Sequence, residues 1–288
     1  SKETRGYGTM LIVTFGALGA VFASVVGKEG AVFAEYTNSI LGTGFSGWQM
    51  AYIVGGLLGL LLLFLRIGTM ESMMYKRVSS GGKSRGNLSI LVQNKDTFIR
   101  YVSCILIGLP IWFIIGVLIA LSVGLTREMG IEGVVTGTAI MYAYIGLVAG
   151  DLVSGYLSQL LRSRKKVVLM FLILNCIFIS VYLFLNNFGI TYFYFICGML
   201  GFANGYWAVF VTNASEQFGT NLRSTVTTAT PNIIRGTTIP ITLSFQYISS
   251  YTGMITGALI VAVICLAIAI LAAVKTQETF GKDLDYVE

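Results

Sequence analysis

Eight stretches of the chain are mostly apolar over about twenty residues, the length a helix needs to cross the hydrocarbon core of a bilayer. Polar loops separate these stretches, and none shows the alternation of apolar and polar positions typical of a membrane-barrel strand. The pattern therefore predicts an all-α polytopic membrane protein with eight transmembrane helices. The predicted spans cover residues 8–26, 48–65, 101–124, 134–157, 167–185, 192–212, 225–247 and 253–274.

The composition agrees with a chain that has the bilayer as its solvent. Apolar residues make up 55% of the 288 positions and charged residues only 11%, against about a quarter in soluble domains. There is no histidine, and the four cysteines (Cys104, Cys176, Cys197 and Cys265) lie inside apolar runs without the paired spacing of a metal or redox site. We therefore expect no metal, no cofactor and no enzymatic activity.

The basic residues are distributed unevenly between the two sides of the predicted membrane. If the N-terminus is cytoplasmic, the outside loops hold only Lys28 and Arg127, and Arg235 lies within a span. Because cytoplasmic loops collect positive charge, this distribution places both termini in the cytoplasm. It also explains the net charge of +6 without a nucleic-acid partner. The sixteen basic residues assigned to the inside are Lys2, Arg5, Arg66, Lys76, Arg77, Lys83, Arg85, Lys95, Arg100, Arg162, Arg164, Lys165, Lys166, Arg223, Lys275 and Lys282.

The longest inside loop divides the chain into unequal parts. Residues 66–100 are rich in Ser, Gly, Lys and Arg, as is typical of a linker. This predicts two helices in 1–65, a cytoplasmic linker in 66–100, a six-helix bundle in 101–274 and a cytoplasmic tail in 275–288.

Four loop motifs resemble those of the major facilitator superfamily, in particular its metabolite and sugar porters. They are the Gly155-Tyr-Leu-Ser-Gln-Leu-Leu-Arg-Ser-Arg-Lys-Lys166 loop, the Ser215-Glu-Gln-Phe-Gly-Thr-Asn-Leu-Arg-Ser224 loop, Arg66…Glu71-Ser72, and Lys2…Arg5-Gly6. The resemblance implies helices five to twelve of a twelve-helix transporter, with the N-terminal helices of the same protein missing from this chain. In the Gly155–Lys166 loop, the family usually has Asp at the position of Gln159 in this chain. This difference argues against a charge relay through that position.

Charged residues at the inside ends of the spans suggest a gate. Arg162, Arg164 and Arg223 crowd these ends, and Glu216 is placed to pair with them. Ion pairs that form in one bundle arrangement and break in the other would bias a rocking equilibrium. Asp151, about 10 Å into its span by the helical rise, is a further gate residue, with a structural pair or a proton carrier as its alternative roles.

A polar stripe follows one predicted span. Steps of three and four place Ser224, Thr228, Asn232, Arg235, Thr238 and Thr242 on one helix face. Such a face is costly against lipid, so it is expected to line an aqueous path, with Arg235 near the midplane. The stripe predicts a substrate site of Arg235, Asn232, Thr228 and Thr238, to which Asn204 and Trp207 add further groups.

Together these features predict a secondary active transporter that works by alternating access. A midplane guanidinium suits a carboxylate or phosphate, so the substrate is expected to be a small anionic metabolite. A salt bridge between Arg235 and Asp151 is the alternative use of that charge. We further expect proton symport and a location in a bacterial inner membrane. The expected partners besides the substrate are protons and membrane lipid. The competing functions are efflux of drugs or siderophore-like compounds, and a non-transporting receptor or assembly subunit.

Overall fold

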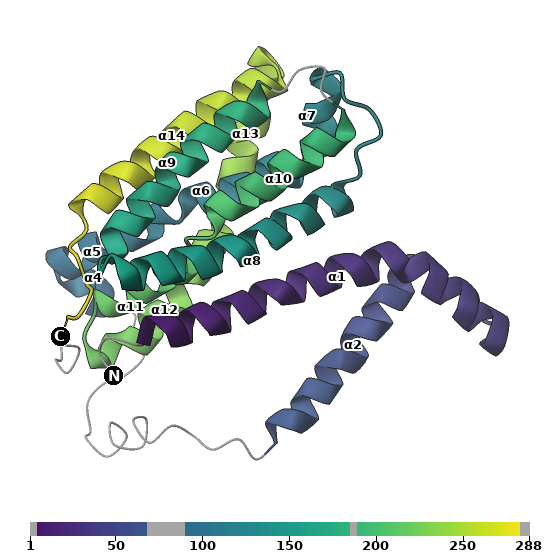
Figure 1. The fold of residues 1–288 in the computed structure, drawn as a ribbon, viewed down its shortest axis with the longest axis horizontal. Helices are drawn as coiled ribbons and strands as arrows, with labels where there is room; N and C mark the ends of the chain where they lie inside the picture. The colour runs from purple at the N-terminus through teal and green to yellow at the C-terminus, as the bar shows by residue number, and fades with distance from the viewer. Residues whose placement is uncertain (1–4, 68–89, 185–188, 283–288) are drawn as a thin grey trace. The chain divides into compact units, whose positions relative to one another are not determined.

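The computed structural model describes residues 5–67, 90–184 and 189–282. Most of the predicted linker and the motif positions Lys2 and Glu71-Ser72 lie outside these residues. The chain divides into two compact units, which we call the bundle unit (Ser1–Leu18 with Arg85–Glu288) and the hairpin unit (Gly19–Ser84). Figure 1 shows the helices of both units.

The predicted all-α fold is confirmed for the described residues, with one difference in the spans. Seven helical segments there are long and apolar enough to cross a membrane. The remaining predicted span, 225–247 (the seventh along the chain), is helical as α12 and α13, which are only 17 and 15 residues long. Thr237 separates them, and the polar stripe gives α12 too little apolarity to qualify by composition.

The hairpin unit consists of the second part of α1 (Arg5–Leu41) and of α2 (Gly47–Arg66). The helix that contains the first predicted span, 8–26, is longer than that span and continues through Lys28, Glu29 and Glu35 to Leu41. The two helices touch closely at Gly30 and Gly47, where a Cβ atom on Gly30 would lie 2.5 Å from the Gly47 carbonyl oxygen. Ser46 and Gln49 form the capping box that begins α2.

The bundle unit contains the first part of α1 and the remaining helices, most of which form six helical elements in the region of the six predicted spans. The first consists of α5, α6, the π-helix η1 and α7; α8 and α9 are continuous; α10 with α11 and α12 with α13 are interrupted; α14 is continuous. Their bounds are α4 Ile90–Gln93, α5 Lys95–Ile107, α6 Leu109–Phe113, η1 Ile114–Ile119, α7 Ser122–Glu128, α8 Thr136–Leu160, α9 Arg164–Leu183, α10 Ile190–Asn204, α11 Trp207–Glu216, α12 Thr220–Gly236, α13 Thr238–Thr252 and α14 Met254–Lys275.

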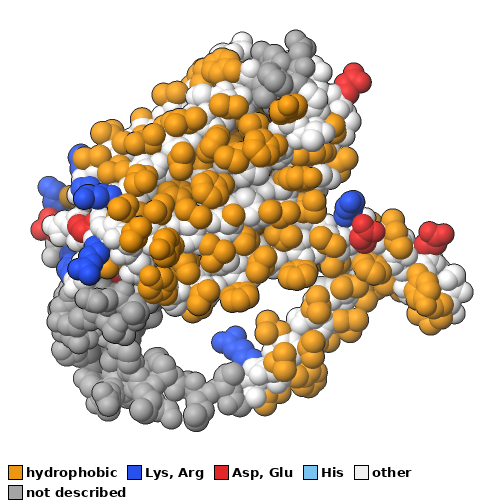
Figure 2. All heavy atoms as spheres, viewed as in Figure 1, with side chains coloured by type: hydrophobic (Ala, Val, Ile, Leu, Met, Phe, Trp, Pro, Cys, Tyr) orange, Lys and Arg blue, Asp and Glu red, His pale blue; other side chains and the backbone are white. Residues whose placement is uncertain are grey.

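Basic residues gather at one end of the bundle unit. This basic end is where α5 and α9 begin and α8 and α14 end, and Figure 2 shows its Lys and Arg side chains beside a visible face covered by hydrophobic ones. The residues there include Lys95, Arg162, Lys165, Lys166 and Lys275. An apolar flank with charges at its end is the distribution expected of helices that cross a bilayer.

The first of the six helical elements of the bundle unit is irregular in its middle. Pro110 lacks an N–H, and the π-helix η1 begins four residues later, so the regular pattern of helical hydrogen bonds is interrupted. Side-chain donors from neighbouring segments bond three of the backbone carbonyls there. Tyr206 Oη donates to Ile107 O at 2.9 Å, Asn204 Nδ2 to Ile111 O at 3.1 Å and Tyr182 Oη to Leu118 O at 2.6 Å.

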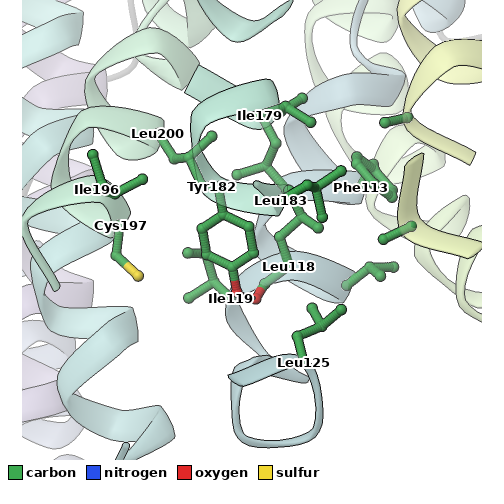
Figure 3. Close-up of a cluster of buried hydrophobic side chains, with 14 of the residues drawn as sticks. Phe113, Leu118, Ile119, Leu125, Ile179, Tyr182, Leu183, Ile196, Cys197 and Leu200 are labelled. Carbon is green, nitrogen blue, oxygen red and sulfur yellow. Dashed lines mark hydrogen bonds between the residues drawn. The ribbon is translucent and has the colours of Figure 1, made fainter. Parts of the chain in front are cut away.

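The last of these bonds lies inside the main apolar core. In Figure 3 the Tyr182 ring stands among Leu118, Ile119 and Leu183, with its hydroxyl directed at the π-helix backbone. Tyr182 is fully buried. The core therefore fixes the irregular segment in place by packing and by a hydrogen bond at once.

Helices α8 and α10 pack backbone against backbone. A Cβ atom built on Gly201 would lie 1.8 Å from the Ala143 carbonyl oxygen, and one on Gly146 would lie 1.9 Å from the Gly198 carbonyl oxygen. Small residues at such contacts allow transmembrane helices to approach closely. This contact holds α10, and with it the interruption before α11, against α8.

This packing predicts the effect on stability of adding a single methyl group at Gly201. Gly201→Ala is expected to destabilise the protein by about 1–3 kcal/mol, because the backbones must separate to admit the new Cβ atom. Gly137→Ala on α8 is the matched control, since a Cβ there would have no atom within 4 Å. Thermal unfolding in detergent compares the two variants. Equal midpoints would contradict the close contact between α8 and α10.

Candidate functional site

The interruption between α10 and α11 is held by α8. Asp151 on α8 is fully buried, and its Oδ1 atom accepts a hydrogen bond from the Ala208 N–H at 3.0 Å, in the first turn of α11. Ser154 Oγ donates to the Gly205 carbonyl oxygen at 2.5 Å. A carboxylate at a helix N-terminus is favoured because the backbone N–H groups there point toward it. Asp151 therefore positions the start of α11.

Trp207, the first residue of α11, lies beside the polar stripe of α12. The guanidinium carbon of Arg235 is 5.9 Å from the ring centre of Trp207 and also 5.9 Å from that of Trp112 on α6. Arg235 Nη1 donates to Asn232 Oδ1 at 3.0 Å, and Asn232 Nδ2 donates to the Thr228 carbonyl oxygen at 3.0 Å. These contacts orient the Arg235 side chain while leaving it exposed on the bundle unit.

These contacts join four of the predicted substrate residues: Arg235, Asn232, Thr228 and Trp207. The other two, Asn204 and Thr238, have other neighbours. Asn204 is fully buried and bonded to the Ile111 carbonyl, while Thr238 lies against Gly116. Three polar atoms in this region are buried without a hydrogen-bond partner among the described residues: Trp112 Nε1, Asn204 Oδ1 and Thr238 Oγ1. Polar atoms left in this state usually have water or a ligand as their partner.

Arg235 and Asp151 do not form the salt bridge that was the alternative to substrate binding. In the described part of the chain, the Arg235 side chain contacts Asn232 and the two tryptophans, and the Asp151 carboxylate accepts from the Ala208 N–H. Trp112 was not among the predicted site residues. Its signal was the Gly108-Leu-Pro-Ile-Trp112 sequence, in which a helix interruption precedes an aromatic residue at membrane depth.

A second polar cluster lies at the basic end of the bundle unit. Arg164 Nε is 3.4 Å from Glu216 Oε2, and the two side chains are only 2% and 1% exposed. Arg164 Nη1 also donates to Ser158 Oγ at 2.8 Å. The cluster joins the end of α8, the start of α9 and the end of α11. It therefore contains two of the predicted gate residues, Arg164 and Glu216, while Asp151 lies deeper in the bundle.

The other two predicted gate residues occupy the same end but different environments. Arg162 is exposed and lies in the turn between α8 and α9, with a φ of 48°, a left-handed conformation that is uncommon for a residue with a side chain. Arg223 is half-buried in the first turns of α12. Among the described contacts, Glu216 forms an ion pair with Arg164.

The segment after α14, which we call the tail strap (Gln277–Phe280), completes this cluster. Thr279 Oγ1 donates to Glu216 Oε2 at 2.7 Å, and the Phe280 ring lies 5.0 Å from the Arg164 guanidinium carbon. Glu278 accepts hydrogen bonds from the Arg164 N–H at 2.9 Å and from the Ser163 hydroxyl. The sequence analysis treated this segment as part of a plain cytoplasmic tail.

Glu278 is expected to make this docking pH-dependent. Burial raises the pKa of its carboxyl, but hydrogen bonds from Ser163 and from the Phe280, Arg164 and Thr279 N–H groups together outweigh burial and lower the pKa below its usual value. A lowered pKa means that docking is fully favoured above the unfolded-state pKa and lost as the pH falls through the folded value. The strap should therefore stay docked throughout the neutral and mildly acidic range.

Glu278→Gln tests this account at neutral pH. It is expected to speed amide hydrogen exchange in residues 276–282, because a neutral side chain accepts these hydrogen bonds more weakly. Glu132→Gln, an exposed acid outside the cluster, is the control. Unchanged exchange in the Glu278 variant would show that the carboxylate does not hold the strap.

The fold is similar to that of a solved transporter structure. The chain resembles the crystal structure of FucP, a Major Facilitator Superfamily transporter in the outward conformation, with a TM-score of 0.66 and 13% sequence identity. The match covers 96% of this chain and 69% of FucP. No family model matches the sequence, and neither does any curated protein. At this identity the likeness concerns the fold.

Proposed function

We propose that the protein is a secondary active transporter that moves a small anionic metabolite across a membrane by alternating access. The observation that carries this proposal is Arg235. It lies within the predicted span 225–247, in the last turn of α12, where it is exposed on the bundle unit, and its orientation is set by Asn232, Trp112 and Trp207. Ionisable groups at such depth are costly, and they are kept where they contact substrate or line a wet path.

The surrounding groups fit an anion with a nonpolar or ring-shaped body. The guanidinium can hold a carboxylate or phosphate through two parallel N–H bonds. The Trp112 and Trp207 rings offer flat apolar surface, and Trp112 Nε1 supplies a donor that has no partner among the described residues. Asn232 and Thr228 add polar groups on the same face of α12. The fold likeness to FucP supports transport as the general activity.

Proton coupling is the second part of the proposal. Asp151 is buried within α8, and while its Oδ1 atom bonds to Ala208, its Oδ2 atom has no hydrogen-bond partner in the described chain. That oxygen is the atom at which a proton would bind. Because Oδ1 holds the start of α11, and Trp207 begins that helix, a change in the charge of Asp151 would act close to the Arg235 site.

Uptake into proteoliposomes tests the transport proposal directly. We expect accumulation of a labelled carboxylate or sugar-acid substrate when an inward proton gradient is imposed, and exchange of the same substrate without a gradient. A panel of monocarboxylates, sugar acids, organophosphates and neutral sugars identifies the substrate class. Transport of neutral sugars alone would overturn the anionic assignment, while the absence of any uptake would favour a receptor or assembly role.

Asp151→Asn separates proton coupling from simple structural support. The amide oxygen can still accept the Ala208 N–H, so the variant should fold and exchange substrate at the parental rate. Proton-driven accumulation should be lost, because an amide does not take up a proton at these pH values. The measurement compares exchange and gradient-driven uptake in the same vesicles. Accumulation at the parental level would show that Asp151 does not carry the coupled proton.

A further inference from the structure

A groove runs between the start of α5 and the end of α14, at the basic end of the bundle unit. Its volume is about 340 Å³. Its lining is almost entirely apolar, with Ser103 and Lys275 as the polar exceptions. The lining residues are Phe98, Ile99, Val102, Ser103 and Leu106 on α5, and Ile268, Leu271, Ala272 and Lys275 on α14.

The two helices present this lining as matched strips. On α5 the residues follow steps of three and four, and the same spacing continued by one turn reaches Lys95 in the first turn of the helix. On α14 the strip ends at Lys275, in the last turn. Each apolar strip therefore finishes on a lysine at the basic end. Asp96, the nearest acid in sequence, is about 100° around the helix from Lys95.

A third cation lies beside the same end of α14. Lys165 Nζ, from the start of α9, donates to the carbonyl oxygen of Val274, the residue before Lys275. The described contacts include no ion pair for Lys95 or Lys275, and both side chains are exposed. An apolar groove that ends in positive charge complements a molecule with an acyl chain and a phosphate group.

We propose that this groove binds an anionic glycerophospholipid, with an acyl chain between α5 and α14 and the headgroup phosphate at Lys275 and Lys95. A zwitterionic lipid would fill the apolar part equally well, but its own cation would compete with the two ammonium groups for the phosphate. The lysine ammonium is a compact charge that suits a phosphate without fixed orientation. The site lies on the bundle unit and does not depend on which substrate is transported.

Native mass spectrometry of the full chain tests the proposal with palmitoyl-oleoyl phosphatidylglycerol and the matching phosphatidylcholine as probes. The protein should retain phosphatidylglycerol more strongly than phosphatidylcholine. Each of Lys95→Gln and Lys275→Gln is expected to weaken phosphatidylglycerol binding by about fivefold, with little effect on phosphatidylcholine. Lys166→Gln, an exposed lysine at the same end but outside the groove, is the matched control.

A steric variant tests the acyl-chain part of the site. Ser103→Trp fills the groove from α5 and should reduce the retention of both lipids, while thermal unfolding in a lipid-free neutral detergent shows that the variant is folded. Soluble glycerol phosphate should not displace the bound lipid, because it lacks the chain. Equal retention of the two lipids, a Lys95 and Lys275 double variant that binds like the parent, displacement by glycerol phosphate, or a dimer that the Ser103 variant dissociates would each overturn the proposal.

Discussion

Replacing Arg235 by Gln is expected to weaken the binding of an anionic substrate by about 10- to 100-fold. The estimate follows from about 1.5–3 kcal/mol for hydrogen bonds to a charged group, at about 1.4 kcal/mol per tenfold change in affinity. Arg235→Lys keeps the charge but loses the planar pair of donors and the stacking on Trp112 and Trp207, so an intermediate loss is expected. Equilibrium binding of the substrate to the purified protein measures both variants.

Two controls make this result specific. Arg127→Gln removes an exposed arginine in α7, far from the α12 stripe in sequence, and should leave affinity unchanged. Combining Arg235→Gln with Asp151→Asn tests whether the two charges act together. Because the described structure places no ion pair between them, their effects on stability should add, whereas a mutual neutralising pair would show rescue in the double variant. Parental affinity in Arg235→Gln would overturn the substrate assignment.

The sequence predicted the helices well because their apolar length is a strong signal, but it did not predict where they are interrupted. The span 101–124 was predicted as one helix and is four short segments around Pro110 and η1. Three backbone carbonyls there are bonded by Tyr182, Asn204 and Tyr206, which are far away in sequence. Hydrogen bonds between residues so far apart in the sequence cannot be predicted from the local spacing of residue types.

The polar stripe shows what periodicity can predict about a site. Steps of three and four correctly placed Thr228 and Asn232 next to Arg235 on one face of α12, because these contacts lie within a single helix. The same reasoning could not identify Trp112 as a neighbour, since that contact depends on how α6 packs near α12. It also left open whether Arg235 pairs with Asp151, which is decided by the packing of α8.

Two of the predicted gate residues, Arg164 and Glu216, contact each other at the basic end, while their role as a gate stays a prediction. Glu216 was expected to pair with one or more basic residues, and the described contacts include an ion pair with Arg164 at the start of α9. Charge patterning alone could not choose among Arg162, Arg164 and Arg223, because all three are close to span ends. The tail strap was missed because Glu278 and Thr279 follow the last span in a short polar segment with no periodic pattern.

The Arg164–Glu216 pair gives the largest effect expected at the basic end. Glu216→Gln leaves the Arg164 guanidinium buried without its counter-charge, and breaking a buried pair in this way costs about 3–5 kcal/mol. Thermal unfolding in detergent should therefore show a marked loss of stability, and proton-driven uptake should fall with it. Glu132→Gln, which removes an exposed acid, should change neither measurement.

A double variant distinguishes a gate from a purely structural pair. Arg164→Met with Glu216→Leu removes both charges and keeps apolar volume, and such replacements of buried ion pairs are often neutral or stabilising. Stability should therefore recover. If the pair biases the two arrangements of the transporter, uptake should stay impaired in the double variant, because the interaction that favours one arrangement is gone. Recovery of parental uptake together with stability would show that Arg164 and Glu216 only support the fold.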